Sequence, residues 1–500
     1  MQEGNFCFEL FLGNISVCDN LIEQFNIKET YKMSERVKTT LYFDGYKLGK
    51  PQKFFMVIAA LTYGFDLMDM SMFGIVTPIL QQNYGITNER LATLNFLFFF
   101  GSFLGSVCGG IMADKLGRKK AILINICIFS LASLMNALWQ PHHLVLLEIS
   151  RFCTGFGTMA ACTVAIAYIS EMLPSEKRGK YQSIILGIGT FSIPFIAILA
   201  STIATRTSES WRIVLIIGAF MLFLVPFAIF FLQESPRWLI SKGRVSDAEK
   251  VMEKCLGIEC DMSEAYKNYQ DSVRDYHKIS TSAQFKIMFS KQQAKQTLVC
   301  IAFAYCLGVG NNMMSAYNQA FLVQIGFPLA IVLLVSAAAA FGQPIGELIS
   351  SLVSDKGGRT KPIFFYCMGA AVMFVVIGLS SSVYMYGVAQ FIKTLFSAGA
   401  MALLMTYIPE SFPTSVRGAA TGYIYGTQKL IIAFVAALLP VWAFGHFGWF
   451  GVNVANAIFW AAAAIVIGLF GKQTALQNID AMNCYTCDTE NEETNPSVEA

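Results

Sequence analysis

The sequence predicts an all-α membrane protein with twelve transmembrane helices arranged as two pseudo-symmetric six-helix bundles. Three observations support this prediction. The 500 residues are 55% hydrophobic with a mean hydropathy of +0.53, which is too apolar for a soluble protein of this length. The chain also contains twelve long apolar stretches, and several short motifs of its first half return in its second half.

The apolar stretches are long enough to cross a bilayer, because about 20 helical residues span about 30 Å of hydrocarbon. Helices are expected because the alternating pattern of a membrane barrel is absent and lipid cannot satisfy an unpaired backbone. The expected spans cover residues 54–80, 91–113, 119–139, 143–171, 181–204, 211–232, 296–323, 328–353, 361–381, 383–410, 418–441 and 445–471.

Charge distribution orients these spans. Most of the 36 Lys and Arg residues fall in the tails and in the loops that follow even-numbered spans, so the positive-inside rule places those regions and both termini in the cytoplasm. The first residues lack the basic start and apolar core of a signal peptide. The predicted regions are a cytoplasmic N-terminal tail (1–53), a first bundle (54–232), a cytoplasmic linker (233–295), a second bundle (296–471) and a cytoplasmic C-terminal tail (472–500).

Two loop motifs occur twice, about 240 residues apart. ADKLGRKK at 113–120 returns as SDKGGRTK at 354–361, and YISEMLPSEKRG at 168–179 returns as YIPESFPTSVRG at 407–418. Repeated halves are typical of alternating access, in which two similar bundles rock around a central site.

The flanking helices repeat as well. Gly101 and Gly105 in span 2 correspond to Gly342 and Gly346 in span 8. Small residues four apart form a flat stripe on a helix, where a second helix backbone can approach closely. The sequence therefore predicts tight helix packing at equivalent places in both halves.

The repeated loops also carry opposite charges at the predicted cytoplasmic ends of both bundles. We interpret these charges as a cytoplasmic gate that holds the inner face closed and separates when that face opens. Alternatively, they cap helix ends and fix the topology. The eight gate residues are Asp114, Arg118, Glu171, Arg178, Asp355, Arg359, Glu410 and Arg417.

These motifs resemble those of a known family. GGIMADKLGRKK resembles the loop signature of the major facilitator superfamily, and YISEMLPSEKRG and QESPRWLISKGR (233–244) resemble its sugar-porter and organic-ion branches. The resemblance covers roughly residues 50–470, and it implies the major facilitator fold and a secondary transporter. The sequence contains no Walker motif, so ATP-driven transport is not expected.

Ionisable side chains inside a span are functional candidates, because each costs about 2.5–3.5 kcal/mol at mid-membrane. Depth along the helices places Asp66 of span 1 and Arg151 of span 4 at a similar level, which predicts a buried ion pair. Asp66 and Asp69 share a helix face, where two carboxylates repel each other and one can carry a proton. Alternatively, the pair with Arg151 is fixed and only holds the first half together.

Two lysines in the second half also lie near the predicted midplane, Lys393 in span 10 and Lys429 in span 11. If both face one cavity they would attract an anion such as a carboxylate. Alternatively, they bond backbone carbonyls or pair with Glu347, which lies nearer the cytoplasmic end of span 8.

Span 7 carries the segment GVGNNMMSAYNQAF (308–321). Glycines beside Asn311 and Asn312 suggest a softened helix with polar groups turned toward the cavity. We expect Asn311, Asn312 and Tyr317 to line the outer side of the substrate or an outer gate, or else to make interhelical hydrogen bonds.

Finer resemblances concern coupling and substrate. DLMDMSMFGIVTPIL resembles the first span of the metabolite–proton symporters, although Leu67 stands where those usually have glycine. Arg151 with Gly155 and Gly157 resembles the RxxxGxG of proton-coupled members. Lys429 lies near a place that is basic in organic-anion carriers of the organic-ion branch. The segment CLGVG stands where sugar porters usually place a paired glutamine, which argues against a hexose site.

We therefore predict a proton-coupled symporter of a small organic anion. Asp66, Asp69 and Arg151 are the expected proton-coupling residues. The alternatives are a sugar or polyol carrier with a structural Asp–Arg pair, and a non-transporting nutrient sensor of the same fold. The expected substrate-binding residues are Lys393, Lys429, Asn311, Asn312 and Tyr317.

The remaining expectations follow from that function. An enzyme is not expected because the chain has no catalytic constellation. No cofactor or metal site is expected, and the proton gradient is the driving force. The partners would be an anionic small molecule and the lipid bilayer, without nucleic acid. The protein would be a multi-pass monomer of the plasma membrane or a bacterial inner membrane.

Overall fold

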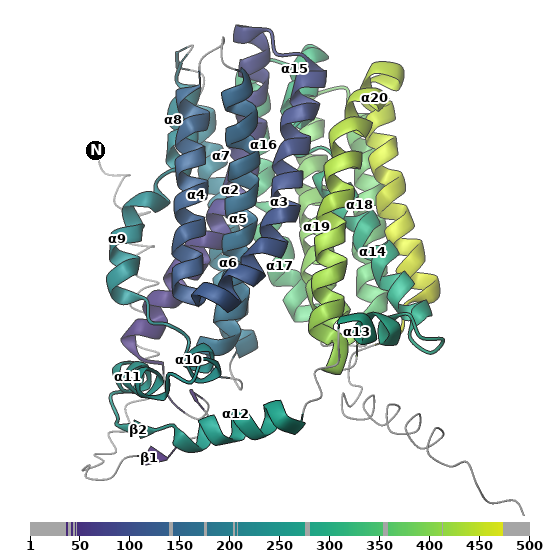
Figure 1. Cartoon of the computed structure of the whole chain (residues 1–500). Coiled ribbons are helices and arrows are strands. Elements are labelled where there is room, and N and C mark those ends of the chain that lie inside the picture. The colour runs from purple at the N-terminus through teal and green to yellow at the C-terminus, as the bar shows by residue number, and fades with distance from the viewer. Residues whose placement is uncertain are drawn as a thin grey trace, which may run out of the picture. The chain divides into compact units, whose positions relative to one another are not determined.

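The computed structural model describes residues 37–38, 42–43, 46, 48–139, 144–174, 178–203, 206–207, 209–275, 281–353, 359–412 and 414–473. The described residues from Lys38 onward belong to one compact unit. Apart from the two short strands β1 (Val37–Lys38) and β2 (Cys260–Asp261), every regular element of the described residues is a helix (Figure 1).

The first half begins with the long helix α2, four residues inside the predicted N-terminal tail, and ends with α9. Its helices in the described part of the chain are α2 (Lys50–Tyr84), α3 (Asn88–Leu116), α4 (Arg118–Leu138), α5 (Leu144–Met172), α6 (Arg178–Thr190), α7 (Ser192–Ile203), α8 (Trp211–Gly218) and α9 (Met221–Phe231).

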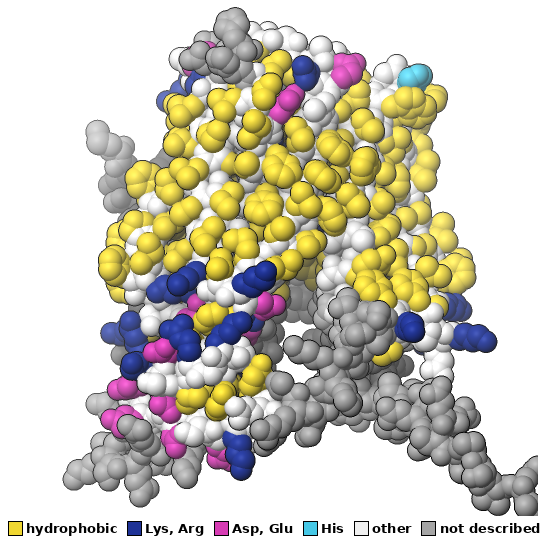
Figure 2. All heavy atoms as spheres, in the orientation of Figure 1, with side chains coloured by type: hydrophobic (Ala, Val, Ile, Leu, Met, Phe, Trp, Pro, Cys, Tyr) yellow, Lys and Arg dark blue, Asp and Glu magenta, His cyan; other side chains and the backbone are white. Residues whose placement is uncertain are grey.

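Short helices occupy the connection between the halves. They are α10 (Pro236–Ser241), α11 (Val245–Leu256), α12 (Ser263–Asp275) and α13 (Thr281–Met288). Ser235 caps α10 by accepting a hydrogen bond from the backbone N–H of Trp238, and proline occupies its first turn. Figure 2 shows Lys, Arg, Asp and Glu side chains gathered over the α10–α12 region, below a body whose surface is mostly apolar.

The second half repeats the order of the first. Its described helices are α14 (Ala294–Asn312), α15 (Asn318–Gln324), α16 (Leu329–Ala340), α17 (Gly342–Val353), α18 (Thr360–Gly378), α19 (Val383–Glu410) and α20 (Thr414–Phe470). Several predicted spans are interrupted: α6 and α7 together form span 5, α8 and α9 form span 6, and α16 and α17 form span 8.

Ten helical stretches of the described chain are long and apolar enough to cross a membrane. One of them, Ala419–Phe470, contains two predicted spans, because Gly448 has a φ of 63° and interrupts the helical geometry inside α20. The predicted seventh span is split into α14 and α15 by the turn at Met313–Tyr317. Nine of the ten stretches are single spans, Ala419–Phe470 holds two, and the split seventh span brings the total to the twelve that the sequence predicts.

The predicted glycine stripes are close-packing sites in both halves. A Cβ atom on Gly101 would lie 2.2 Å from the backbone oxygen of Phe152, and one on Gly342 would lie 2.4 Å from that of Phe391. The next turn repeats the arrangement, at 2.2 Å for Gly105 and 2.1 Å for Gly346. Such distances leave no room for a side chain. The close approach of α3 to α5 and of α17 to α19 therefore requires glycine at these positions.

Large apolar side chains cover the outside of the bundles. Phe223 is 71% exposed and Phe230 is 75% exposed, values that would be costly in water for a ring of that size. Figure 2 shows these apolar side chains as a broad band above the charged region. The surface is therefore that of a protein whose solvent at mid-height is lipid.

Candidate functional site

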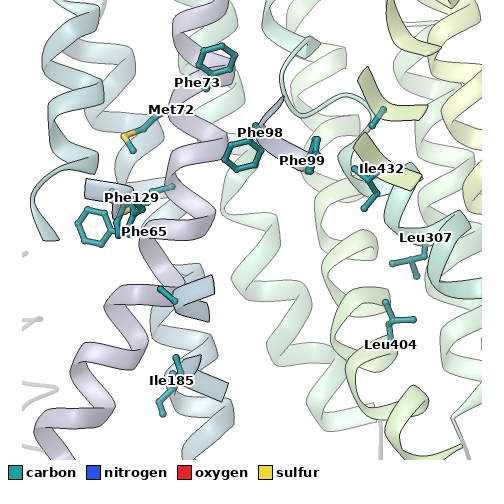
Figure 3. Close-up of a cluster of buried hydrophobic side chains, with 14 of the residues drawn as sticks. Phe65, Met72, Phe73, Phe98, Phe99, Phe129, Ile185, Leu307, Leu404 and Ile432 are labelled. Carbon is teal, nitrogen blue, oxygen red and sulfur yellow. The ribbon is translucent and has the colours of Figure 1, made fainter. Parts of the chain in front are cut away.

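A buried ion pair joins the first and fourth spans. Arg151 of α5 donates from Nη1 to Oδ2 of Asp69 of α2 over 2.9 Å, and the two side chains are 2% and 1% exposed. The guanidinium lies 3.9 Å from the centre of the Phe73 ring and 4.5 Å from that of Phe98. Both rings belong to the apolar cluster in Figure 3, so the pair is enclosed by aromatic side chains.

This pair is incompletely satisfied. Asp69 Oδ1 and Arg151 Nε are buried and have no hydrogen-bond partner. A buried charge that keeps an unused acceptor or donor is more costly than a fully bonded one. The carboxyl of Asp69 therefore has one oxygen available for a proton while the other remains bonded to Arg151.

The sequence placed Asp66 at the level of Arg151, whereas the structure pairs Arg151 with Asp69. The expectation that spans 1 and 4 share an ion pair is correct, but the chosen aspartate is wrong. A helical side chain leans toward the N-terminus of its helix, and α5 begins at the predicted external end. The long side chain of Arg151 therefore reaches Asp69, one turn further along α2 toward that end.

Asp66 instead lies at the interface between the two halves. Thr158 of α5 is within hydrogen-bonding reach of its carboxyl, and Lys429 of α20 is its basic neighbour. Both Asp66 and Lys429 are partly exposed. The interaction therefore links the first and second bundles through opposite charges.

Three further side chains complete what we term the interface cluster, which consists of Tyr63, Asp66, Cys162, Glu347 and Lys429. The Cys162 thiol interacts electrostatically with both Asp66 and Lys429. The Tyr63 phenol interacts with Asp66, Cys162 and Glu347. The cluster thus brings two carboxylates and one ammonium together where the halves meet.

Lys393 has a different environment from Lys429. Its ammonium lies 5.2 Å from the centre of the Phe374 ring of α18, and within the described residues it forms no ion pair. No described contact joins Lys393 to Lys429 or to Asp66. The structure therefore places only Lys429 of the two in the interface cluster, and a shared anion site remains a prediction.

The span 7 residues are split in their exposure. Asn311 is exposed, whereas Asn312 is 8% exposed and donates to the Gly308 carbonyl of its own helix over 2.8 Å. Tyr317 is 0% exposed, and its hydroxyl donates to the Ala437 carbonyl of α20 over 2.8 Å. In this conformation Asn312 and Tyr317 bond backbone groups of the second half, and their substrate contacts remain a prediction.

Hydrogen bonds between the halves gather at the predicted external end. Gln324 of α15 donates 3.1 Å bonds to Gln81 and to Asn88, and Gln81 donates to Asn88 over 2.8 Å. Asn95 of α3 also donates to the Ala436 carbonyl of α20 over 3.3 Å. These bonds hold the predicted external ends of the two bundles together.

The gate motifs form equivalent ion pairs inside each half. Arg118 donates from Nε and Nη2 to one oxygen of Glu171, Oε1, at 3.1 and 2.8 Å. Arg359 donates to Glu410 at the same two distances, but to its two oxygens, Oε2 and Oε1. Asp114 lies 3.2 Å from Arg118 but is 76% exposed, so its contribution is screened by solvent. The described contacts therefore join helices within a half, and a latch between the halves remains a prediction.

Three of the predicted gate residues lie beyond what the structure describes. Asp355 is outside the described residues. The side chains of Arg178 and Arg417 are likewise not described, although their backbones begin α6 and lie in α20.

Sequence reasoning missed the two residues that cap the helices following the gate loops. Glu234 accepts the backbone N–H groups of Arg118 at 2.8 Å and Lys119 at 3.2 Å. Gln473 accepts those of Arg359 at 3.1 Å and Thr360 at 3.5 Å. Glu234 belongs to the quoted QESPRW motif, and Gln473 follows it by 239 residues, which is also the spacing of the YISEML and YIPESF motifs.

The fold and the paired loops define a class of protein, the multi-pass secondary transporters of the major facilitator superfamily. A family model described as "Sugar (and other) transporter" matches residues 52–484, and the chain belongs to that family. It is therefore a small-molecule transporter in a membrane and not an enzyme.

Individual relatives share between a quarter and a third of their aligned residues with this chain. The chain is 28% identical over 436 residues to the metabolite transport protein YyaJ of Bacillus subtilis, covering 85% of this chain and 94% of the relative. It is 25% identical over 414 residues to an arabinose-proton symporter of the same organism, covering 78% and 86%. A partially occluded inward-open structure of the xylose transporter XylE from Escherichia coli superposes with a TM-score of 0.70 at 16% identity, covering 86% of this chain and 99% of that one. This similarity confirms the predicted twelve-helix, two-bundle fold.

Proposed function

We propose that this protein is a proton-coupled symporter of a small polyhydroxylated, sugar-like metabolite. The arabinose-proton symporter and a D-xylose-proton symporter that superposes with a TM-score of 0.67 support both the substrate class and the coupling ion. These relatives favour the sugar or polyol alternative over the small organic anion predicted from the sequence.

One structural observation carries the proton coupling. The buried Asp69–Arg151 pair leaves an oxygen of Asp69 without a partner, beside the rings of Phe73 and Phe98. Protonation of that carboxyl would weaken its bond to Arg151 and free α2 to move against α5. Asp66, one turn away, is the second proton-binding candidate.

A second candidate substrate is an organic anion, favoured by Lys429. Its ammonium faces Asp66 across the interface, where a substrate carboxylate could replace the aspartate as its partner. A polyhydroxylated acid would use the hydroxyl-binding groups of a sugar site and this lysine together.

Uptake into proteoliposomes of the full chain tests both candidates. The matched pairs D-xylose with D-xylonate and D-glucose with D-gluconate would each be assayed with and without an inward proton gradient. We expect gradient-driven accumulation of at least one neutral sugar, and loss of the gradient dependence in the Asp66→Asn and Asp69→Asn chains. Accumulation of the acids alone, lost in Lys429→Gln, would replace the sugar by the anion. Flux that ignores the gradient would defeat the symport.

A further inference from the structure

Glu347 is a carboxylate of the interface cluster that neither the family resemblance nor the sequence assigned to transport. It lies on α17, and the α6 helix of the first half packs on α17. Thr190 at the end of α6 and Gln343, one turn earlier on α17, are polar neighbours of the Glu347 carboxyl, and the Thr190 hydroxyl donates to the Gly187 carbonyl over 3.0 Å. Glu347 therefore sits in the seam where the two bundles meet.

The internal repeat also indicates that position 347 lies where the two halves meet. Ser106 of α3 is the first-half equivalent of Glu347, since each precedes the aspartate of its loop motif by eight residues. The Ser106 hydroxyl lies 3.8 Å from the point where a Cβ of Gly426 in α20 would stand. Contacts between the halves therefore occur at both related positions, but only the second half carries a carboxylate there.

Glu347 also differs from the other carboxylates of the site. Asp69 forms an ion pair with Arg151, and Asp66 has the Lys429 ammonium as a neighbouring charge without an ion pair being formed. Among the described residues, no Lys, Arg or His forms an ion pair with Glu347, and its ionisable neighbour is the Tyr63 phenol of α2.

Within the part of the chain that the structure describes, the other elements packed on α17 bring no cation to Glu347; the side chains of Arg178 and Lys180 on α6 lie outside that part. From α19, Phe391, Thr394 and Leu395 approach the Gly342 and Gly346 side of α17 with backbone and uncharged atoms. Lys393 of the same helix places its ammonium over the Phe374 ring of α18 instead.

An uncompensated carboxylate in such a place is stable only while water reaches it. Glu347 lies six residues before the end of α17, roughly 9 Å from the predicted cytoplasmic end, and it is partly exposed in this structure. When the seam closes at that end and excludes water, the charge would remain buried without a partner, which is costly. A proton removes that charge and leaves a neutral acid beside Thr190.

We propose that Glu347 is a further proton-binding residue, in addition to Asp69 and Asp66. It takes up a proton when the cytoplasmic seam between α6 and α17 closes and releases it to water when the seam opens. The proposal deepens the proposed function and rests on proton coupling, but it assigns the inner proton site to the second half. The step moves one proton between the Glu347 carboxyl and water and changes no other bond.

Infrared difference spectroscopy of the full chain in lipid vesicles tests the site without any substrate. The wild-type protein is compared between buffers of about pH 8 and about pH 6, a range in which an ordinary Asp or Glu carboxyl stays ionised, and the protonated carboxyl C=O band is recorded. We expect Glu347→Gln to lose one component of that band, which belongs to the Glu347 carboxyl. Asp66→Asn should keep this component. Glu148→Gln, which removes a carboxyl paired with Arg90 at 2.8 Å near the other end, serves as the matched control and should keep it too.

An unchanged band in Glu347→Gln would overturn the proposal. If that variant does not reach a folded state, Glu347→Asp keeps a carboxyl on a shorter side chain, and its component must titrate at a different pH from the wild type. Titration identical to the wild type would also overturn it. A lost component together with gradient-independent uptake of D-xylose would preserve the proton site while defeating the proposed symport.

Discussion

The two halves of this protein share a frame and differ in their charges. The glycine contacts of α3 with α5 return between α17 and α19, and the Arg118–Glu171 pair returns as Arg359–Glu410 at the same distances. In contrast, the first half holds its deepest charges as an internal pair, whereas Glu347, Lys393 and Lys429 of the second half form no ion pair within the described part of that half.

The difference teaches which features belong to the scaffold and which to the particular carrier. Features present in both halves hold helices together and are required by the rocking of two similar bundles. Charges present in one half cannot serve that shared purpose. Lys429 and Glu347 of the second half, which neighbour Asp66 and Thr190 of the first, are therefore where we propose that the second half takes part in binding substrate and proton.

The largest expected effect comes from breaking the internal pair. Asp69→Asn leaves the Arg151 guanidinium buried with no ionic partner, which should cost about 3–5 kcal/mol of stability. Asp66→Asn is the matched control, because Asp66 is partly exposed and its loss leaves Lys429 near water. Thermal unfolding of the detergent-purified chains measures both. Equal losses of stability for the two variants would show that the Asp69–Arg151 ion pair does not hold the first half together more strongly than Asp66 does.

The shared frame predicts equal costs for equivalent glycines. Gly105→Ala and Gly346→Ala would each place a methyl within about 2 Å of a backbone oxygen, so each should destabilise by about 1–3 kcal/mol. Gly110→Ala and Gly422→Ala are the controls, since nothing lies within 4 Å of either added methyl. These controls should be neutral or stabilising, by up to about 1 kcal/mol. A cost confined to one half would contradict equivalent packing.

The gate pairs should respond alike to loss of their two-bond geometry. Arg118→Lys and Arg359→Lys keep the charge but replace a guanidinium that donates twice to one carboxylate. Loss of about 1.4 kcal/mol would shift the conformational equilibrium about tenfold, so we expect a comparable, severalfold fall in proteoliposome uptake from each.

Arg244→Lys is the control for this comparison, because Arg244 pairs with Asp247 on the exposed surface of the linker. Its uptake should match the wild type. If one gate variant alone impairs uptake, the two pairs have diverged in role despite their equal bond lengths.

Sequence reasoning reached the fold because its signals are repetitive. Apolar length fixes a membrane helix almost independently of its neighbours. The glycine stripes and loop motifs occurred twice, and the packing of Gly101 on Phe152 and of Gly342 on Phe391 followed from them.

The site was less predictable because it depends on how single side chains turn. Span depths separated Asp66 from Asp69 by one turn, which is less than the uncertainty of a helix end, and only the lean of Arg151 decides between them. The separation of Lys393 from Lys429 depends on the rotation of two helices. Glu234 could have been found from the sequence, because it is a carboxylate in a recognisable motif and carboxylates commonly cap helix starts. Gln473 could not, because it lies beyond the last apolar stretch.

The smallest expected effect concerns these two caps, which differ in charge. Burial raises the pKa of Glu234, although backbone N–H donors of Ser235, Lys119 and Arg118 act against it. A raised folded-state pKa means that the carboxyl's contribution to stability is complete below its ordinary value of 4.5 and is lost as the pH rises through the raised value. Wild-type stability should therefore fall relative to Glu234→Gln as the pH rises through that window.

Denaturation of both chains across that pH range measures the difference. Gln473→Ala is the control, because the Gln473 amide does not titrate and its removal should shift stability equally at every pH. A wild-type advantage over Glu234→Gln that instead grows with rising pH would mean that the N–H donors outweigh burial. In that case the first-half cap works as an anion at the start of α4, a role for which the uncharged Gln473 has no counterpart in the second half.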